Sequence, residues 1–249
     1  MVPDSTLING LGRYQGGPST PLSVVNVQQG LRYRFRVVST SCNPSFNFTI
    51  DGHRMTIIEV DGTEVQPVEV DSIPILAGQR YSVVVTANQT VGNYWIRSLS
   101  NLNGTFEGNQ NMAILRYGGA PDQDPTSPPG PYELSFNEGH LHPLINPGAP
   151  GIPEIGKADV NLQIASGYSA EGYFTFGNAS FVNPPVPVLL QILSGARHPS
   201  QFLLNGSVYE LPPNKVVEIS FPNSTLAPGA PVCAILARRC SVLTLCAFF

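Results

Sequence analysis

A strict alternation of apolar and charged side chains in one short segment limits the folds open to this chain. From Leu31 to Val38, the apolar positions Leu31, Tyr33, Phe35 and Val37 alternate with Arg32, Arg34 and Arg36. An extended strand separates these two sets, because its successive side chains point to opposite faces. The segment therefore predicts a half-buried β-strand that rests one face on a core.

Further strand patterns follow at short intervals. They cover residues 46–50, 55–60, 81–86, 93–97 and 112–117. Asp51-Gly52 and Asp61-Gly62 mark turns before and after the second of these segments, because both residue types tolerate unusual backbone angles. The 24 glycines and 24 prolines agree with many short strands joined by turns. The predicted fold class is all-β, a Greek-key β-sandwich or barrel.

The patterns divide the chain into four parts. The first β domain is expected to span residues 1–117, and residues 118–150, rich in proline and glycine, are expected to form an extended connector. Strand patterns resume at 160–164, 186–193, 207–211 and 216–221, which are too few to complete a second β domain over residues 151–230. Residues 231–249 form a divergent tail that holds three of the four cysteines.

Composition and charge exclude several classes of function. Apolar residues make up 42% of the chain and charged residues 12%, which argues against disorder. The net charge of −4 has no long run of either sign, so neither nucleic acid nor an anionic membrane is an expected partner. No apolar stretch reaches the roughly 18 residues of a membrane span, and the N-terminus does not look like a signal peptide.

Six Asn-X-Ser/Thr sequons nevertheless indicate a secreted ancestry. They begin at Asn47, Asn88, Asn103, Asn178, Asn205 and Asn223, and none has proline at its middle position. Six such sites exceed what chance would readily place in a chain of this length. We expect a glycosylated, extracellular family, although the location of a chain without a recognisable leader stays open.

Several stretches occur in an order shared with one enzyme family. They are Thr6–Arg13, Arg32–Arg36, Ser41–Pro44, Ile50–His53, Thr56–Gly62, Gln79–Ser82 and Val186–Ile192. In this order they resemble fungal laccases, which are multicopper oxidases built from three cupredoxin domains. The resemblance covers residues 1–230 and implies a complete second cupredoxin-like domain followed by the start of the third.

The resemblance implies an oxidoreductase that uses copper. Laccases take single electrons from phenolic donors at a blue copper and reduce oxygen to water at a three-copper cluster. Their ligand motifs are His-Trp-His, His-Ser-His, His-Pro-Phe-His-Leu-His and His-Cys-His, none of which occurs here. We therefore expect a laccase fragment that is inactive alone and binds no copper tightly. We also expect it to self-associate through faces that would otherwise be covered.

The resemblance assigns three residues to the binding of phenolic donors. Asn43 stands where laccases often carry an acidic residue that contacts the phenol, and an amide can hydrogen-bond a phenol but cannot take its proton. Phe106 and Phe181 match apolar walls of the donor pocket, with ordinary core or surface aromatics as the alternative. Cys42 matches a cysteine whose disulfide partner lies in the family's first domain, so here that partner is missing.

The histidines do not by themselves predict a metal site. His140 and His142 would share one side of a strand, but the proline and glycine around them favour a loop, and the matching run in laccases does not bind copper. His53 is expected to hydrogen-bond within a loop. Glu59, Asp61 and Glu64 surround a hairpin and are expected to be solvated and not catalytic.

A second function remains open beside the oxidase fragment. In that alternative the chain is a non-catalytic β-sandwich that binds aromatic compounds or glycans through Asn43, Phe106 and Phe181. No serine–histidine–aspartate order, phosphate-binding glycine loop or paired-cysteine motif indicates another class of enzyme.

Overall fold

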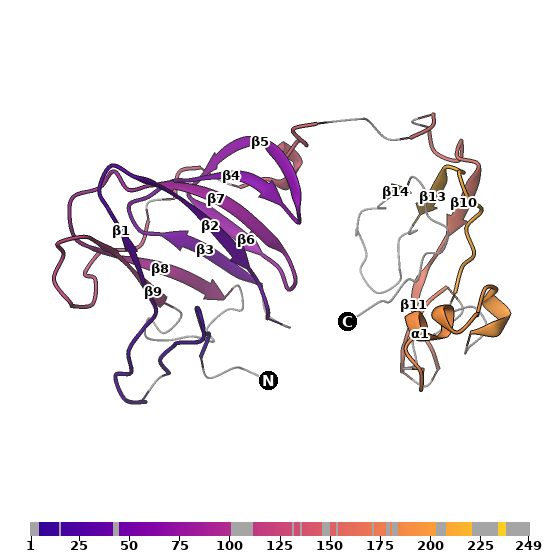
Figure 1. Cartoon of the computed structure of the whole chain (residues 1–249), viewed down its shortest axis with the longest axis horizontal. Helices are drawn as coiled ribbons and strands as arrows, with labels where there is room; N and C mark the ends of the chain where they lie inside the picture. Colours follow the sequence, from indigo (N-terminus) through magenta and orange to yellow (C-terminus); the bar gives the residue numbers. More distant parts are fainter. Residues whose placement is uncertain are drawn as a thin grey trace. The chain divides into compact units, whose positions relative to one another are not determined.

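The chain forms two compact units, Met1–Asn146 and Pro147–Phe249, in the computed structural model shown in Figure 1. The structure describes residues 5–14, 16–41, 45–100, 112–130, 132–134, 136–145, 150–152, 154–170, 172–177, 180, 184–202 and 208–220, and the backbone of 234–237. Among these residues, no helix is long and apolar enough to cross a membrane.

The first unit contains two β-sheets (Figure 1). One has the strand order β1-β9-β8-β3-β6, and its strands are Val24–Val27, Met112–Tyr117, Asn93–Ser100, Phe46–Ile50 and Ser72–Ile75. The other has the order β2-β7-β4-β5, formed by Arg32–Val38, Arg80–Thr86, Met55–Val60 and Thr63–Val70. Within the sheets β1 and β9 pair in parallel, whereas the other neighbours are antiparallel. The all-β prediction is confirmed.

One hydrophobic core joins the two sheets. Its buried members come from both, including Phe48, Ile73 and Leu115 on the five-stranded sheet and Ile57 and Val83 on the four-stranded sheet. Alternation along each strand delivers these side chains to one side, as expected for a sandwich with interleaved inner faces. On β2 the predicted alternation is confirmed, because exposed and half-buried positions alternate along the whole strand.

Strands β5 and β6 were not predicted from the sequence, because each contains a proline, Pro67 and Pro74 respectively. Proline cannot donate a hydrogen bond to a neighbouring strand, so it is confined mostly to the edges of sheets. Both strands are edge strands here. The turn predicted at Asp61-Gly62 is confirmed: both residues have positive φ, 48° and 85°, and they join β4 to β5.

The described residues of the expected connector up to residue 145 are attached to the first unit. The Gln66 N–H donates to the His142 carbonyl at 2.8 Å, and Val65 forms an isolated bridge with Pro143. The Asp71 carboxylate accepts the backbone N–H groups of Glu133 and Leu134. A short 3-10 helix, η1 (Glu138–His140), follows. The first compact unit thus extends to residue 146, while the expected domain limit at residue 117 stays a prediction.

The second unit has a smaller core. Strand β10 (Val160–Gln163) pairs in parallel with β13 (Val217–Ser220), which pairs antiparallel with β14 (Ala234–Ala237). A two-stranded sheet joins β11 (Ser166–Tyr168) to β12 (Phe174–Phe176), and a 3-10 helix, η2, spans Pro199–Gln201. The buried apolar residues of this core are Ile164, Leu211, Val217 and Ile219.

The strand predicted over residues 186–193 is wrong. The structure forms an α-helix, α1 (Val188–Leu193), preceded by Pro187 and followed by Gly195 with φ 110°. Leucine and glutamine favour helix, proline is tolerated at a helix start, and glycine readily takes the positive φ that ends a helix. A short uninterrupted apolar run does not by itself distinguish a helix from a buried strand.

Candidate functional site

A buried polar cluster lies where β3 ends in the turn Asp51-Gly52. Gly52 has φ 71°, a backbone angle that glycine adopts without strain. The Asp51 carboxylate accepts Arg97 Nε at 2.8 Å and Arg97 Nη2 at 2.7 Å, and also Ser127 Oγ at 2.7 Å. The ion-paired side chains are 1% and 4% exposed. Ser127 therefore links the proline-rich segment to Asp51, after β3, and to Arg97 of β8.

His53 completes this cluster from the other side of the turn. Its Nδ1 lies 2.8 Å from the Asp51 carbonyl oxygen and its Nε2 lies 2.6 Å from the Tyr117 hydroxyl. The expectation that His53 hydrogen-bonds within a loop is confirmed. Burial lowers the pKa of His53, although the hydrogen bond to the Asp51 carbonyl and the nearby Asp51 carboxylate oppose that shift. Both ring nitrogens are thus engaged by protein groups.

Sequence reasoning missed Arg97, Tyr117 and Ser127 as members of this cluster. Arg97 directly follows the apolar run Tyr94-Trp95-Ile96 in a predicted strand. A charged residue at such a position indicates that it has an oppositely charged partner if it is buried. Tyr117 and Ser127 carry no such signal, since their role depends on contacts with residues far away in the chain.

The proposed donor-contact residues lie outside the described residues, as does Cys42. This applies to Asn43, Phe106 and Phe181. The described flanks of the first two are nevertheless close, because Phe46 of β3 pairs with Ser100 of β8 and Arg97 of β8 pairs with Met112 of β9. The described strand ends Phe46, Ser100 and Met112 therefore lie at one end of the same sheet. The turn Asp51-Gly52 lies at the opposite end of β3.

The described residues do not fit a laccase-type copper centre. Such centres need several imidazoles that converge, with a thiolate at the blue copper. His53 has both nitrogens engaged, His140 and His142 are exposed, and His198 lies 3.6 Å from Glu210. Within the described part of the chain, no three histidine, cysteine, aspartate or glutamate side chains gather as a metal-binding group.

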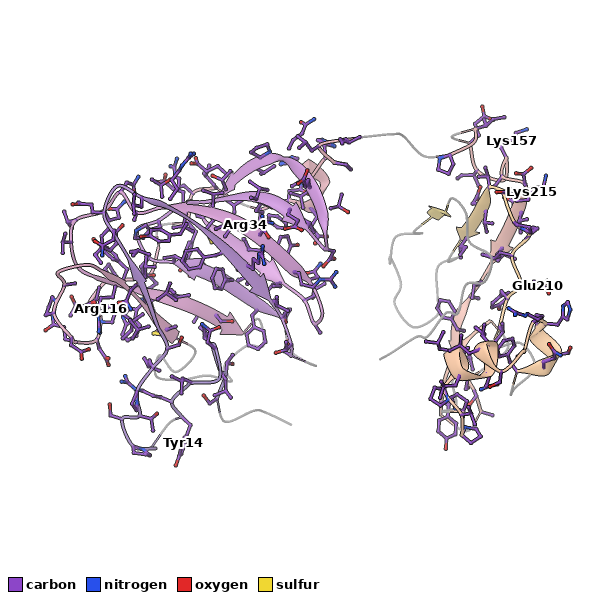
Figure 2. All side chains as sticks on the ribbon, viewed as in Figure 1. Tyr14, Arg34, Arg116, Lys157, Glu210 and Lys215 are labelled. Atoms are coloured by element: carbon purple, nitrogen blue, oxygen red, sulfur yellow. The ribbon has the colours of Figure 1, made fainter. Side chains whose placement is uncertain are left out.

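The acidic residues near the β4–β5 hairpin contact neighbouring strands of the first unit. Glu59 accepts hydrogen bonds from Ser82 and from Arg34, whose side chain is labelled in Figure 2, and these bonds lower the Glu59 pKa. Asp61 accepts the Arg80 N–H at 2.9 Å. These contacts are hydrogen bonds and an ion pair between neighbouring strands, and nothing in them indicates an acid–base pair.

Two of the six sequons are described. Asn88 is exposed in the connection between β7 and β8, whereas Asn47 is half-buried inside β3, between β6 and β8. The sequons at Asn103, Asn178, Asn205 and Asn223 lie outside the described residues.

Sequence comparison with known proteins identifies relatives of this chain. Residues 1–120 match the family model described as "Multicopper oxidase". Laccase-2 of Pleurotus ostreatus is 53% identical over 232 residues, covering 92% of this chain and 43% of that protein. Laccase-2 of Trametes villosa is 53% identical over 230 residues, covering 92% and 44%. The chain thus spans less than half the length of these curated relatives.

Solved structures agree on the fold. The laccase of Botrytis aclada superposes with a TM-score of 0.68 at 24% identity, covering 88% of this chain and 42% of that one. Fet3p, described as a multicopper oxidase that functions in iron import, gives 0.60 at 24% identity, covering 81% and 40%.

The two-sheet fold is shared with solved multicopper oxidases, and this span of chain is related in sequence to the multicopper oxidase family. Within the family, the resemblance to fungal laccases seen in the sequence is confirmed at 53% identity.

Proposed function

We propose that this chain is the central part of a laccase-type oxidase, comprising its second cupredoxin domain and the beginning of its third. The observation that carries the proposal is 53% identity maintained over 92% of the chain. The activity of the whole protein would be the oxidation of phenolic donors coupled to the reduction of oxygen to water. Copper would supply the one-electron chemistry in that protein.

In this proposal the present span contributes to donor binding and does not hold the coppers. The chain has four histidines and lacks the family's paired histidine motifs. Its contribution would be the three residues that the resemblance assigns to the donor, Asn43, Phe106 and Phe181. Asn43 could accept or donate a hydrogen bond to a phenol without taking its proton at neutral pH.

Copper loading tests the proposal. The purified chain would be incubated with copper(II), freed of unbound metal and examined for metal content and visible absorption. We expect a colourless, copper-poor protein that does not oxidise 2,6-dimethoxyphenol. A blue thiolate band with near-stoichiometric copper would contradict the proposal.

The second candidate is a non-catalytic module that binds aromatic compounds or glycans through the same three residues. The pairing of Phe46 with Ser100 favours it, because this pairing brings the attachment points of two candidate segments together. Trp95 is the single tryptophan and lies in β8, so its fluorescence reports on this sheet. A saturable change on titration with a simple phenol, weakened by Phe106→Ala, would support this candidate.

Secretion and self-association also belong to the proposal. The sequons and the laccase relatives support a secreted parent protein. Helix α1 supports association, because Leu189, Leu190 and Leu193 are 66%, 51% and 73% exposed. Gel filtration at several concentrations should show a species larger than the monomer, and a monomer at all concentrations would contradict self-association.

A further inference from the structure

Tyr117 and His53 form a short, buried contact between a phenolic hydroxyl and an imidazole in the first unit. The Tyr117 hydroxyl lies 2.6 Å from His53 Nε2. The two residues are 0% and 5% exposed, so water does not compete for this bond. Neither residue contributes to the donor binding proposed above, and the pair therefore needs its own explanation.

The partners of the two residues fix the direction of the hydrogen bonds. The Asp51 carbonyl can only accept, so His53 Nδ1 carries a proton and donates it at 2.8 Å. In a neutral imidazole Nε2 is then the acceptor, and the Tyr117 hydroxyl donates to it. The Tyr117 oxygen in turn accepts the Gln89 N–H at 3.1 Å. Every polar atom in this chain of bonds is satisfied.

Burial favours the neutral form of both groups. It lowers the pKa of His53 and raises the pKa of Tyr117, the latter opposed in part by the Gln89 N–H. At neutral pH the proton therefore rests on the phenol, with an unprotonated nitrogen at hydrogen-bond distance. Proton transfer along a bond of this length is the geometry required of a general base.

We propose that Tyr117 and His53 form a redox-active pair, in which Tyr117 gives up one electron while its phenolic proton passes to His53. The O–H bond of Tyr117 breaks, an Nε2–H bond forms, and a neutral tyrosyl radical faces an imidazolium. The oxidant is a one-electron acceptor such as a phenoxyl radical, which becomes a phenol by taking this electron and a proton from water. Return of one electron to Tyr117 brings the proton back from His53.

The surroundings of His53 stabilise the protonated product. Its Nδ1–H remains bonded to the Asp51 carbonyl, and the Asp51 carboxylate lies close enough to favour a positive imidazole. Oxidation therefore leaves one positive charge on the buried imidazolium, which the Asp51 carbonyl and carboxylate stabilise. Without His53 the proton would have to cross a buried apolar region, which is costly for any charged group.

Tyr94 connects the pair to the protein surface. Its ring centroid lies 5.5 Å from that of Tyr117 and 5.0 Å from that of His53. Tyr94 is half-buried, and its hydroxyl donates to the Thr90 carbonyl at 2.8 Å. An electron can therefore pass between Tyr117 and an external radical through a neighbouring aromatic ring, without opening the core. The pair would quench reactive phenoxyl radicals near the protein.

Photochemical oxidation of the purified chain tests the pair without any need for copper or enzymatic activity. A photogenerated ruthenium(III) polypyridyl complex would serve as the one-electron oxidant, with electron paramagnetic resonance as the readout. In the unsubstituted chain labelled with [15N]histidine, we expect a neutral tyrosyl radical that couples to a histidine nitrogen. Loss of that coupling in Tyr117→Phe is the second expected result.

Tyr33→Phe is the matched control. Tyr33 is a half-buried tyrosine of the first unit whose hydroxyl accepts the Gln28 N–H at 2.7 Å and makes no hydrogen bond to an imidazole of the described residues. This variant should keep the coupled signal. A radical without histidine coupling in the unsubstituted chain, or one located on Trp95, would overturn the proposal, and this measurement does not depend on whether Tyr117→Phe folds.

Discussion

The carboxylate of Asp51 and the guanidinium of Arg97 form a two-point ion pair, with N–O distances of 2.8 and 2.7 Å, in the interior of the first unit. The two residues are 46 positions apart in the sequence, and the pair links the turn after β3 to the middle of β8. Such a pair resists the loss of either member, because the remaining charge would be buried without a partner.

Arg97→Met is therefore expected to lower the free energy of unfolding by about 3–5 kcal/mol. Urea denaturation followed by Trp95 fluorescence measures this, since Trp95 neighbours Arg97 in β8. Arg54→Met is the control. The Arg54 guanidinium lies 3.1 Å from the Glu69 carboxylate, and the two side chains are 53% and 52% exposed. Exposed ion pairs of this kind contribute about 0–1 kcal/mol to the free energy of unfolding. Equal small effects of both substitutions would contradict the structural role of the buried pair.

His53 should make the stability of the first unit depend on pH. The unfolded chain binds a proton at His53 with an ordinary pKa of about 6.5, whereas burial lowers the folded pKa. Below pH 6.5 the unfolded state therefore holds more protons, and stability falls as pH decreases towards the folded pKa. The groups around His53 are the Asp51 carboxylate, which is paired with Arg97, the Tyr117 hydroxyl and the ring of Tyr94.

Urea midpoints between pH 5 and pH 8 check this dependence. His53→Gln should flatten the slope below about pH 6.5, because the titrating group is removed. The exposed His142 provides the control, since His142→Gln should leave the slope unchanged. A slope that persists in His53→Gln would assign the dependence to another group.

The two described sequons should differ in modification when the chain is expressed through a secretory pathway. Asn88 is exposed in a connection, where a bulky glycan meets no obstacle, whereas Asn47 lies inside a strand and its sequon residue Thr49 is 2% exposed. We expect Asn88→Gln, but not Asn47→Gln, to remove glycan mass. A glycopeptide containing Asn47 in mass spectrometry would refute this difference.

The core between the sheets should respond strongly to truncation. Ile73 is fully buried on β6, so Ile73→Ala is expected to destabilise by about 2–5 kcal/mol. Val91 is 50% exposed, and Val91→Ala should change stability by less than about 0.5 kcal/mol. Urea midpoints that shift equally for the two variants would show that Ile73 does not lie in a tightly packed core.

Strand patterns made most of the first unit predictable. Alternation located β2 and β3, short apolar and aromatic runs located β4, β7, β8 and β9, and the Asp-Gly pairs located two turns. Pro67 and Pro74 concealed β5 and β6, because proline is acceptable only where a sheet has an edge, and edges are defined by strand order. In the second unit, the apolar run before Gly195 became a helix, and β11 and β12 had no recognised pattern.

The sequence by itself determined the fold class, the family and the hydrogen-bonding role of His53, since these follow from local periodicity, turn chemistry and motifs preserved in order. Tertiary structure alone decided that Asp51 meets Arg97 and Ser127, and that His53 meets Tyr117. These residues are 46, 76 and 64 positions apart. Local patterns do not identify the partners in such pairs, because packing and burial, not sequence distance, select the partner that a buried polar group needs.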